Sequence, residues 1–369
     1  MMTLDNLDTP ALLVDLDAMD ANLVAMQQRV SAKGVKLRPH TKAHKIPALA
    51  MKQLSLGAEG ICTAKLGEAE VMAEAGIEDI LITTPIANPI KYQRLVALHL
   101  AYPEGKFCQV VDHADHILGI GKYAMDAGIT VELLIEVESG QQRCGVAVGE
   151  PLVTLIELIQ ATDGVSYRGI QAYSGHLQHV KGFNERQAQA RTAVVGIFEF
   201  IDSHLRPMNL APDVISGGGT GTYEAYDGLG FTEIQAGSYI FMDAAYRGIG
   251  NREGRAINDE FSNALKVWTT VISHPTKERA VVDAGMKCLS IDMGMPLVED
   301  REDIRYQTGG DEHGILHLAD NHAGLAIGQR LMMLPSHCDT TLNSYSTLYG
   351  IRGDRVINSW DIAGRGRSD

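Results

Sequence analysis

The stretch Val131-Glu132-Leu133-Leu134-Ile135-Glu136-Val137 decides how this chain is expected to fold. It is a short apolar run with the length of a buried strand, and a segment with helical spacing follows it. The same alternation recurs along the first two thirds of the chain. The runs that qualify as strands are Val35–Arg38, Gly60–Thr63, Asp79–Thr84, Phe107–Val111, Val131–Val137, Tyr167–Tyr173, Asp213–Ser216 and Phe231–Gln235.

Between these runs lie longer segments rich in Ala, Leu, Glu and Gln. They include Leu66–Ala75, Pro89–Ala101, Ala114–Ala127, Leu152–Ala161 and Asn184–His204. Eight strand–helix units over about 220 residues are the number expected of a (β/α)8 barrel. A doubly wound sheet has the same periodicity and stays the alternative, although polar residues cluster after the strands as they do in barrels.

The pattern changes after Asn251-Arg252-Glu253-Gly254-Arg255, which has the composition of a linker. Short β-like runs with frequent turns follow: Leu265–Ser273, Arg279–Val282, Gly314–Leu318, Gln329–Leu334 and Arg355–Ile362. We therefore expect a barrel over residues 15–250. A mostly-β domain is expected from residues 1–14 and 251–369, with Ala11–Val14 as its first strand.

Composition narrows the class of protein. A net charge of -14 over 369 residues argues against nucleic acid or an anionic membrane as the partner. No signal peptide is visible at the start, and no apolar run approaches the roughly 20 residues of a membrane span. Five widely spaced cysteines without a CxxC pair make a disulfide framework unlikely and a reducing cytoplasm the default.

Two glycine-containing loops follow the last two predicted strands. They are Ser216-Gly217-Gly218-Gly219-Thr220-Gly221-Thr222 and Ala236-Gly237-Ser238-Tyr239. Barrel enzymes often bind phosphate after strands seven and eight, where backbone N–H groups approach the anion closely. One such loop alone would be read as a tight turn, but two at these positions favour phosphate. A dinucleotide site is disfavoured, because GxGxxG is absent.

The first predicted strand ends in Arg38-Pro39-His40-Thr41-Lys42-Ala43-His44-Lys45. Such a run of cations is usually a solvated edge. A lysine at the mouth of a barrel, however, can have its pKa lowered by its neighbours and then attack an aldehyde.

Seven short motifs rich in polar residues and glycine, including the segments just described, occur in order along the chain. They are RPHTKAHK at 38–45, GQQRCGV at 140–146, QAYSGHLQH at 171–179, GGGTGT at 217–222, QAGSY at 235–239, DEHG at 311–314 and PSHCDTTLN at 335–343. Together they closely resemble the D-threonine aldolase and D-serine dehydratase family, which shares its barrel with bacterial alanine racemases. The resemblance implies pyridoxal phosphate, a divalent metal and a homodimer.

The resemblance also assigns cofactor contacts. Lys42 is implied as the Schiff-base lysine, and its position within RPHTK distinguishes it from Lys45. Arg143 would face the phenolic oxygen, Tyr173 would lie beside the ring, and Gln235 would face the pyridine nitrogen, where alanine racemases have an arginine. A neutral partner there gives little support to ring protonation, so a moderate electron sink is expected. The residues implied around the phosphate are Gly219, Thr220, Gly221, Gly237, Ser238 and Tyr239.

The metal assignment concerns His337 and Asp339. On an extended segment, residues i and i+2 point to the same side, so both could bind one ion, with Cys338 pointing away as a structural residue. A surface polar pair is the common alternative. Dehydratase members resemble His-x-Cys, suited to zinc, whereas aldolase members resemble His-x-Asp, suited to manganese or magnesium. Zinc stays an alternative for this chain, because an imidazole with a hard oxygen suits several ions.

Three histidines have different expectations. His179 matches the family's catalytic base, whereas His176 is expected to be a loop histidine. His313 is either structural or close to the site across a dimer interface.

The function these assignments imply is metal-dependent retro-aldol cleavage of a D-3-hydroxy amino acid, of the D-threonine or D-3-hydroxyaspartate type, to glycine and an aldehyde or glyoxylate. The alternative within the family is a D-serine or D-threo-3-hydroxyaspartate dehydratase, in which Lys42 removes the Cα proton. A pyridoxal-phosphate carrier protein is the alternative outside it. A racemase is disfavoured, because no match to the catalytic tyrosine motif of those enzymes is visible.

Overall fold

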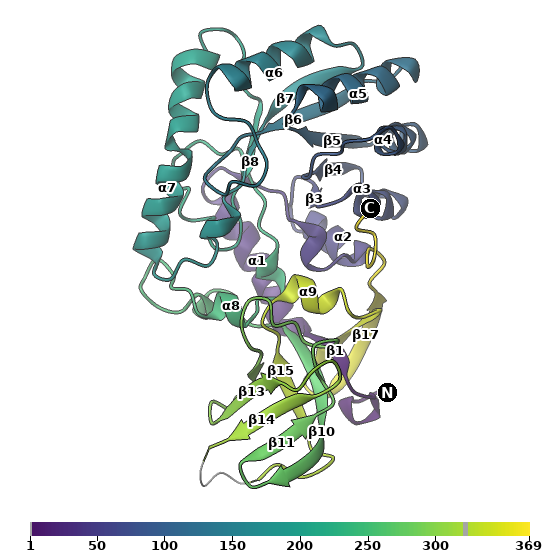
Figure 1. The fold of residues 1–369 in the computed structure, drawn as a ribbon, viewed down its shortest axis with the longest axis vertical. Coiled ribbons are helices and arrows are strands. Elements are labelled where there is room, and N and C mark those ends of the chain that lie inside the picture. The colour runs from purple at the N-terminus through teal and green to yellow at the C-terminus, as the bar shows by residue number, and fades with distance from the viewer. Residues whose placement is uncertain (1, 320–323) are drawn as a thin grey trace. The chain divides into compact units, whose positions relative to one another are not determined.

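The computed structural model describes residues 2–319 and 324–369. The chain divides into two compact units, and Figure 1 colours them by residue number. The barrel unit comprises Gln27–Gly237 with Arg367–Asp369, and the β unit comprises Met1–Met26 with Ser238–Gly366. The domain boundaries expected from the sequence stay a prediction.

The barrel unit is built on parallel strands. They are β2 (Lys36–Leu37), β3 (Ile61–Thr63), β4 (Asp79–Ile82), β5 (Lys106–Val111), β6 (Val131–Glu136), β7 (Val165–Ala172), β8 (Val214–Gly217) and β9 (Glu233–Ile234). Their order is β2-β9-β8-β7-β6-β5-β4-β3, and a parallel bridge between His40 and Cys62 joins the two ends of the sheet. The eight-stranded barrel is therefore confirmed, and the doubly wound alternative is wrong.

Helices cover the outside of these strands (Figure 1). They are α2 (Pro47–Ser55), α3 (Leu66–Glu74), α4 (Pro89–Ala101), α5 (Ala114–Asp126), α6 (Glu150–Ala161) and α7 (Phe183–Phe200). The expected alternation fails once: the chain between β8 and β9 contains turns and no helix. Gly218, Gly228 and Gly230 have positive φ there, a conformation that ends regular structure.

Helix α1 (Leu16–Ser31) was not predicted from the sequence. Met19, Leu23, Met26 and Val30 are buried on it at helical spacing. The boundary between the β unit and the barrel unit falls inside this helix, between Met26 and Gln27.

The β unit is mostly antiparallel, as expected. Its strands are β1 (Ala11–Asp15), β10 (Leu265–Thr276), β11 (Arg279–Val282), β12 (Leu297–Val298), β13 (Ile304–Thr308), β14 (Gly314–Leu318), β15 (Arg330–Leu334), β16 (Thr347–Arg352) and β17 (Arg355–Asp361). The pairing β10-β11-β14-β13-β12-β15-β10 closes a ring. Strand β1 pairs antiparallel with β10 and parallel with β16, so the N-terminal strand is part of this unit.

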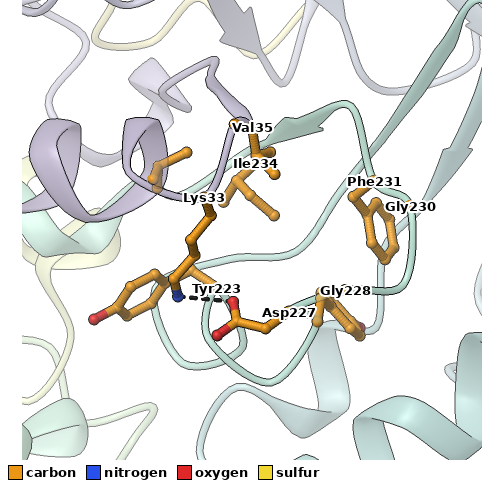
Figure 2. A pocket seen from close by; sticks show the side chains of 11 residues that line it. Lys33, Val35, Tyr223, Asp227, Gly228, Gly230, Phe231 and Ile234 are labelled. Carbon is orange, nitrogen blue, oxygen red and sulfur yellow. Dashed lines mark ion pairs between the residues drawn. The ribbon is translucent and has the colours of Figure 1, made fainter.

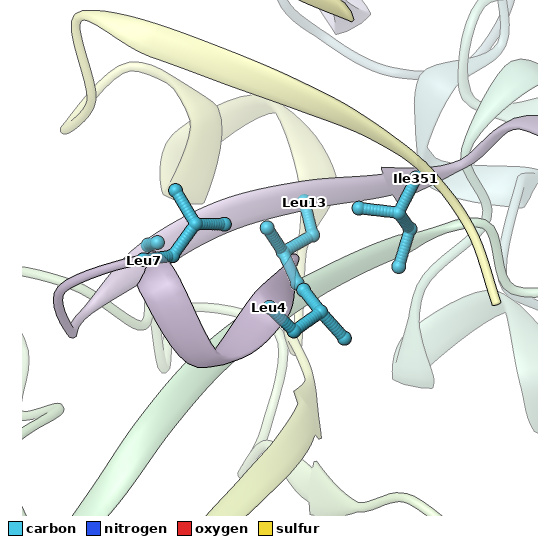
Figure 3. Close-up of a cluster of buried hydrophobic side chains, with 5 residues drawn as sticks. Leu4, Leu7, Leu13 and Ile351 are labelled. Carbon is cyan, nitrogen blue, oxygen red and sulfur yellow. The ribbon is translucent and has the colours of Figure 1, made fainter. Parts of the chain in front are cut away.

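A small apolar cluster holds the N-terminal segment in the β unit (Figure 3). Leu4 and Leu7 pack with Ala11 and Leu13 of β1 and with Ile351 of β16, and all five are buried. Burial of such side chains contributes roughly 1.5–3 kcal/mol each, so this cluster fixes β1 between its two partners.

Two sequence expectations concern the chain as a whole. In the described parts, 2–319 and 324–369, no helix combines the length and the apolar character that a membrane span requires. All five cysteines are free thiols, and Cys62, Cys108 and Cys338 are buried.

Candidate active site

Lys42 lies in a short 3-10 turn (Thr41–Ala43) directly after β2. Neighbouring strands hold this turn from both sides. The His40 N–H donates to the carbonyl of Ala236 at 3.0 Å, and the Thr41 hydroxyl donates to the carbonyl of Cys62 at 2.9 Å. These two hydrogen bonds fix the turn that places Lys42 at the carboxyl end of a barrel strand.

Lys45, the other lysine of the motif, has a different environment. Its side chain is buried, and its ammonium lies 3.1 Å from a carboxylate oxygen of Glu68. Lys42 is only half-buried. The two lysines therefore differ in burial, and the ion pair with Glu68 engages the ammonium of Lys45.

Arg143 and Tyr173 meet at the ends of β6 and β7. The guanidinium carbon of Arg143 lies 5.5 Å from the centre of the Tyr173 ring, within cation–π range. A guanidinium nitrogen of Arg143 also lies 3.7 Å from a carboxylate oxygen of Glu136. The structure therefore brings together two of the predicted cofactor residues and adds Glu136, which the sequence analysis missed.

Glu136 is nine-tenths or more buried inside the barrel, and burial raises the pKa of its carboxyl to about 8. A hydrogen bond from Gln171 and the charge of Arg143 oppose that shift. A buried polar side chain inside a barrel needs partners, and Glu136 finds them at the ends of neighbouring strands. Its importance was not visible in the sequence, because Val131–Val137 has the pattern of an ordinary apolar strand.

The loop after β8 is joined closely to the loop after β7. The N–H of Gly221 donates to Oε1 of Gln178 at 3.0 Å, and a Cβ at Gly221 would lie 2.0 Å from the Gln178 carbonyl oxygen. A Cβ at Gly219 would lie 2.5 Å from Gln178 Oε1, and the N–H of Gly219 donates to Thr222 Oγ1 at 3.0 Å. Gly221 is therefore required for close approach of the two backbones, whereas Gly219 lies against the end of the Gln178 side chain.

These contacts bear on the expected phosphate site. The N–H groups of Gly219 and Gly221 already donate within the protein, so their predicted contact with phosphate stays a prediction. Gly237 lies at the end of β9, where a Cβ would lie 2.9 Å from the His40 carbonyl oxygen, next to the turn that carries Lys42. The loop glycines and the lysine turn thus form a close-packed cradle at the strand ends.

Arg186, a residue that the sequence analysis missed, anchors the same loops. Its Nε donates to the Gly221 carbonyl at 2.6 Å and its Nη1 to the Val180 carbonyl at 2.8 Å. The side chain is buried, although it starts from helix α7. The sequence offered one signal for this role: Arg186 lies in a segment predicted to be an amphipathic helix, and its position could have been compared with the buried face of that helix.

The other predicted barrel residues are distributed as follows. Thr220 and Gln235 are buried, and His179 is half-buried in the loop after β7, whereas His176 is exposed. Ser238 and Tyr239 belong to the β unit, where Tyr239 is buried and its ring packs edge-on at 6.2 Å from Phe261.

A cavity of about 320 Å³ in the barrel unit lies beside the connection between β8 and β9 (Figure 2). Lys33 points toward Asp227 there, with 2.7 Å between the charged atoms, and its ammonium lies 5.1 Å from the centre of the Tyr223 ring. None of the predicted site residues lines this cavity. It results from the connection that has no helix and is separate from the strand-end residues.

The predicted metal ligands lie in the β unit at the start of a short helix, α9 (Cys338–Leu342). His337 is the N-cap residue and Asp339 lies in the first turn. The expectation of an extended segment, on which the i and i+2 argument depended, is therefore wrong. The physical reason is a long-range contact: the buried carboxylate of Asp243 accepts a hydrogen bond from the Cys338 N–H at 2.9 Å and starts the helix there.

His337 is oriented by a carboxylate that the sequence analysis missed. Its Nδ1 lies 2.7 Å from Oδ2 of Asp292, whose other oxygen accepts a hydrogen bond from Thr340 at 2.9 Å. With Nδ1 engaged, Nε2 is the nitrogen left for a metal.

Asp339 and His337 together supply one carboxylate and one imidazole. Within residues 2–319 and 324–369, no cluster of three or more His, Cys, Asp or Glu side chains could hold a metal ion.

Cys338 fits its expected structural role. Its side chain is fully buried, and burial raises the pKa of the thiol well above its usual range, so the sulfur stays protonated. It donates to Oδ1 of Asp339 at 3.3 Å. His313 is exposed, and its expected role across a dimer interface stays a prediction.

The comparisons with known proteins agree with this architecture. Residues 14–245 match the family described as "Alanine racemase, N-terminal domain", and residues 264–351 match the "Putative serine dehydratase domain". The barrel, the closed β ring and the lysine after the first barrel strand define an alanine-racemase-like, fold-type III pyridoxal-phosphate enzyme.

Full-length relatives narrow the class. A 3-hydroxy-D-aspartate aldolase of Paracoccus denitrificans (strain Pd 1222) is 37% identical over 98% of this chain and 93% of its own. A D-threonine aldolase of Arthrobacter sp is 37% identical over 99% of this chain and 94% of its own. The crystal structure of D-threonine aldolase from Filomicrobium marinum superposes with a TM-score of 0.92 at 37% identity, covering 99% of this chain and 97% of that one.

Relatives described as dehydratases also match but are more distant. The chain belongs to the D-threonine aldolase and D-serine dehydratase family. It is more similar to these aldolases, which are carbon–carbon lyases, than to these dehydratases.

Proposed function

We propose that this protein catalyses the retro-aldol cleavage of D-3-hydroxy amino acids. D-threonine would give glycine and acetaldehyde, and D-3-hydroxyaspartate would give glycine and glyoxylate. The observation that carries the proposal is the pair of His337 and Asp339 at the start of α9, an imidazole and a hard carboxylate where dehydratase members resemble His-x-Cys. It is supported by similarity to two aldolases over nearly the whole chain.

Pyridoxal phosphate fits the strand-end residues of the barrel unit, and when bound it supplies the electron sink for breaking the Cα–Cβ bond. Lys42 would hold it covalently, and Arg143 would lie against its phenolic oxygen, with Tyr173 beside the ring. Its phosphate would lie at the two loops, among Gly219, Thr220, Gly221, Gly237 and Ser238, with Tyr239 as the next residue of the second loop. The close approach of Gly221 to Gln178 keeps that cradle rigid.

A divalent metal fits His337 and Asp339, and when bound it supplies a Lewis acid that lowers the pKa of a hydroxyl. We assign manganese or magnesium, because the donor set is one nitrogen and one hard oxygen. Asp292 engages Nδ1 of His337 and would leave Nε2 for the ion, while the buried Cys338 thiol donates to Asp339.

His179 would take the proton of the substrate β-hydroxyl, as a histidine base does near neutral pH. Its half-buried place in the loop after β7 suits that role better than the exposed place of His176.

The direct test is product analysis of the purified holoenzyme with D-threonine, D-3-hydroxyaspartate and D-serine, each with and without added manganese. We expect manganese-dependent glycine from the first two substrates. Release of a 2-oxo acid and ammonia in place of glycine would support the dehydratase alternative. Full glycine release after chelation would overturn the metal assignment.

We further propose that the enzyme is a cytoplasmic homodimer that binds a small D-amino acid, with no nucleic acid or membrane as partner. The net charge of -14 supports the exclusion of nucleic acid and anionic membranes as partners. Sedimentation of the holoenzyme tests the oligomeric state, and a monomer at working concentration would contradict it.

A further inference from the structure

Three buried side chains form a continuous hydrogen-bonded row across the interior of the barrel. Glu136 ends β6, Gln171 lies near the end of β7, and Gln235 follows β9. They are 3%, 1% and 4% exposed, so water does not compete for their hydrogen bonds. In such surroundings each amide can in principle exchange the places of its oxygen and its nitrogen. The row has one donor-to-acceptor direction only if one of its amides faces groups that can act in a single way.

Gln171 is fixed in this way. Its Nε2 donates to Oε2 of Glu136 and, at 3.0 Å, to the backbone carbonyl of Thr83. A backbone carbonyl is an acceptor only, and so is an ionised carboxylate. Reversing the Gln171 amide would place oxygen against both acceptors, so its Oε1 must point to the other side.

The orientation of the Gln235 amide is set by Gln171. Its Nε2 donates at 2.8 Å to Oε1 of Gln171 and at 2.8 Å to Oγ of Ser216. An amide nitrogen carries two hydrogens, and these two bonds use both. The group that Gln235 can offer to a ligand is therefore its Oε1, an acceptor.

We propose that Glu136, Gln171 and Gln235 act as a directional relay that presents Gln235 Oε1 to the pyridine nitrogen of bound pyridoxal phosphate and keeps that nitrogen protonated. The proposal rests on the proposed function, because it uses the assignment of Gln235 to the ring nitrogen. A protonated ring nitrogen donates to an acceptor, whereas an unprotonated one would place its lone pair against the amide oxygen. The relay thus gives a stronger electron sink than the neutral side chain alone suggests.

Glu136 also links the relay to the phenolic side of the cofactor, since its other oxygen lies 3.7 Å from Arg143. Its raised pKa does not reverse the row, because a neutral carboxyl can carry its proton on Oε1 while Oε2 accepts from Gln171. Gln235 and Gln171 are accordingly positioning residues for the ring nitrogen.

The test uses the holoenzyme reconstituted with pyridoxal phosphate labelled with ¹⁵N in the ring. Nitrogen NMR at neutral pH distinguishes the protonated from the unprotonated ring directly. We expect the protonated signal in the native protein, loss of that signal in Gln235→Leu and Gln235→Arg, and partial loss in Gln171→Leu. Gln109→Leu is the matched control, because Gln109 is fully buried on β5 and donates to the Thr84 and Val110 carbonyls instead.

An unprotonated ring in the native holoenzyme would overturn the relay, and this measurement needs no variant to fold. A protonated ring that is unchanged in both Gln235 variants would also overturn it. Glycine release from D-threonine is measured in parallel. Glycine release with an unprotonated ring refutes the relay alone, whereas a protonated ring without glycine or 2-oxo acid release refutes the proposed function alone.

Discussion

The two units hold their candidate residues in different ways. In the barrel unit, the residues follow parallel strands, and buried partners such as Gln178, Arg186 and Glu136 fix the loops from behind. In the β unit, His337 and Asp339 start a helix of five residues, and Asp292, which orients His337, is 44% exposed. The barrel site is therefore preorganised by buried contacts, whereas the metal site depends on a few polar contacts close to solvent.

The largest expected effect is in the barrel unit. Lys42→Ala should lower kcat/KM for glycine release by about three orders of magnitude or more, because the covalent attachment of the cofactor is lost. Reduction with borohydride followed by peptide mass analysis should find the cofactor on residue 42 of the native enzyme. Lys45→Ala is the control: it breaks the ion pair with Glu68 and should lower stability while the label stays on Lys42. A label on Lys45 would contradict the assignment.

The next effect tests the dependence of the β unit on Asp292. Asp292→Ala should weaken manganese binding by about 10–100-fold, because Nδ1 of His337 loses the carboxylate that orients the ring. Calorimetric titration with manganese measures the change. Glu312→Ala removes another exposed carboxylate of the β unit, the partner of Lys287, and should leave the affinity within about a factor of two. Equal losses in both variants would show that only net charge matters.

A smaller effect tests the rigidity of the barrel cradle. Gly221→Ala places a methyl group 2.0 Å from a backbone oxygen, and the rearrangement should cost about 1–3 kcal/mol of stability along with cofactor affinity. Gly196→Ala is the matched control, because a Cβ there meets nothing within 4 Å and the residue lies inside α7. That control should be neutral or stabilising by about 1 kcal/mol. Denaturant unfolding of both variants measures their free energies of unfolding. Equal values for the two would contradict the close approach at Gly221.

The last prediction concerns the dependence of stability on pH. The pKa of Glu136 is about 8 in the folded protein against 4.5 for the free side chain, so the folded state binds more protons between these values. Stability contributed by this group is therefore present at low pH and falls as pH rises toward 8, by at most about 1.4 kcal/mol per pH unit. Glu136→Gln should flatten that slope in the cofactor-free protein. An unchanged slope between pH 6 and 7 would show that Glu136 is already ionised.

The difference between the two units also explains which features the sequence could predict. The barrel strands were located within a few residues, because buried apolar runs bounded by turns have a strong local pattern. The chemical partners were missed, since Glu136 meets Gln171, and Gln171 meets Gln235, only in the folded barrel. In the β unit, the extended reading of 337–339 failed because Asp243, far away in sequence, caps Cys338 and starts a helix. Local patterns carry no information on such contacts.

Strand β1 has a consequence for biosynthesis. It pairs with β10 and β16, which are made much later than β1. At about 5–20 residues per second, roughly 250 residues of further translation separate β1 from β10 by about 10–50 seconds. During that interval the barrel strands can assemble on the ribosome, while the apolar Leu12, Leu13 and Val14 have no strand to pair with. The nascent chain therefore carries an unpaired apolar strand until β10 and β16 have been made, and such a strand edge favours aggregation.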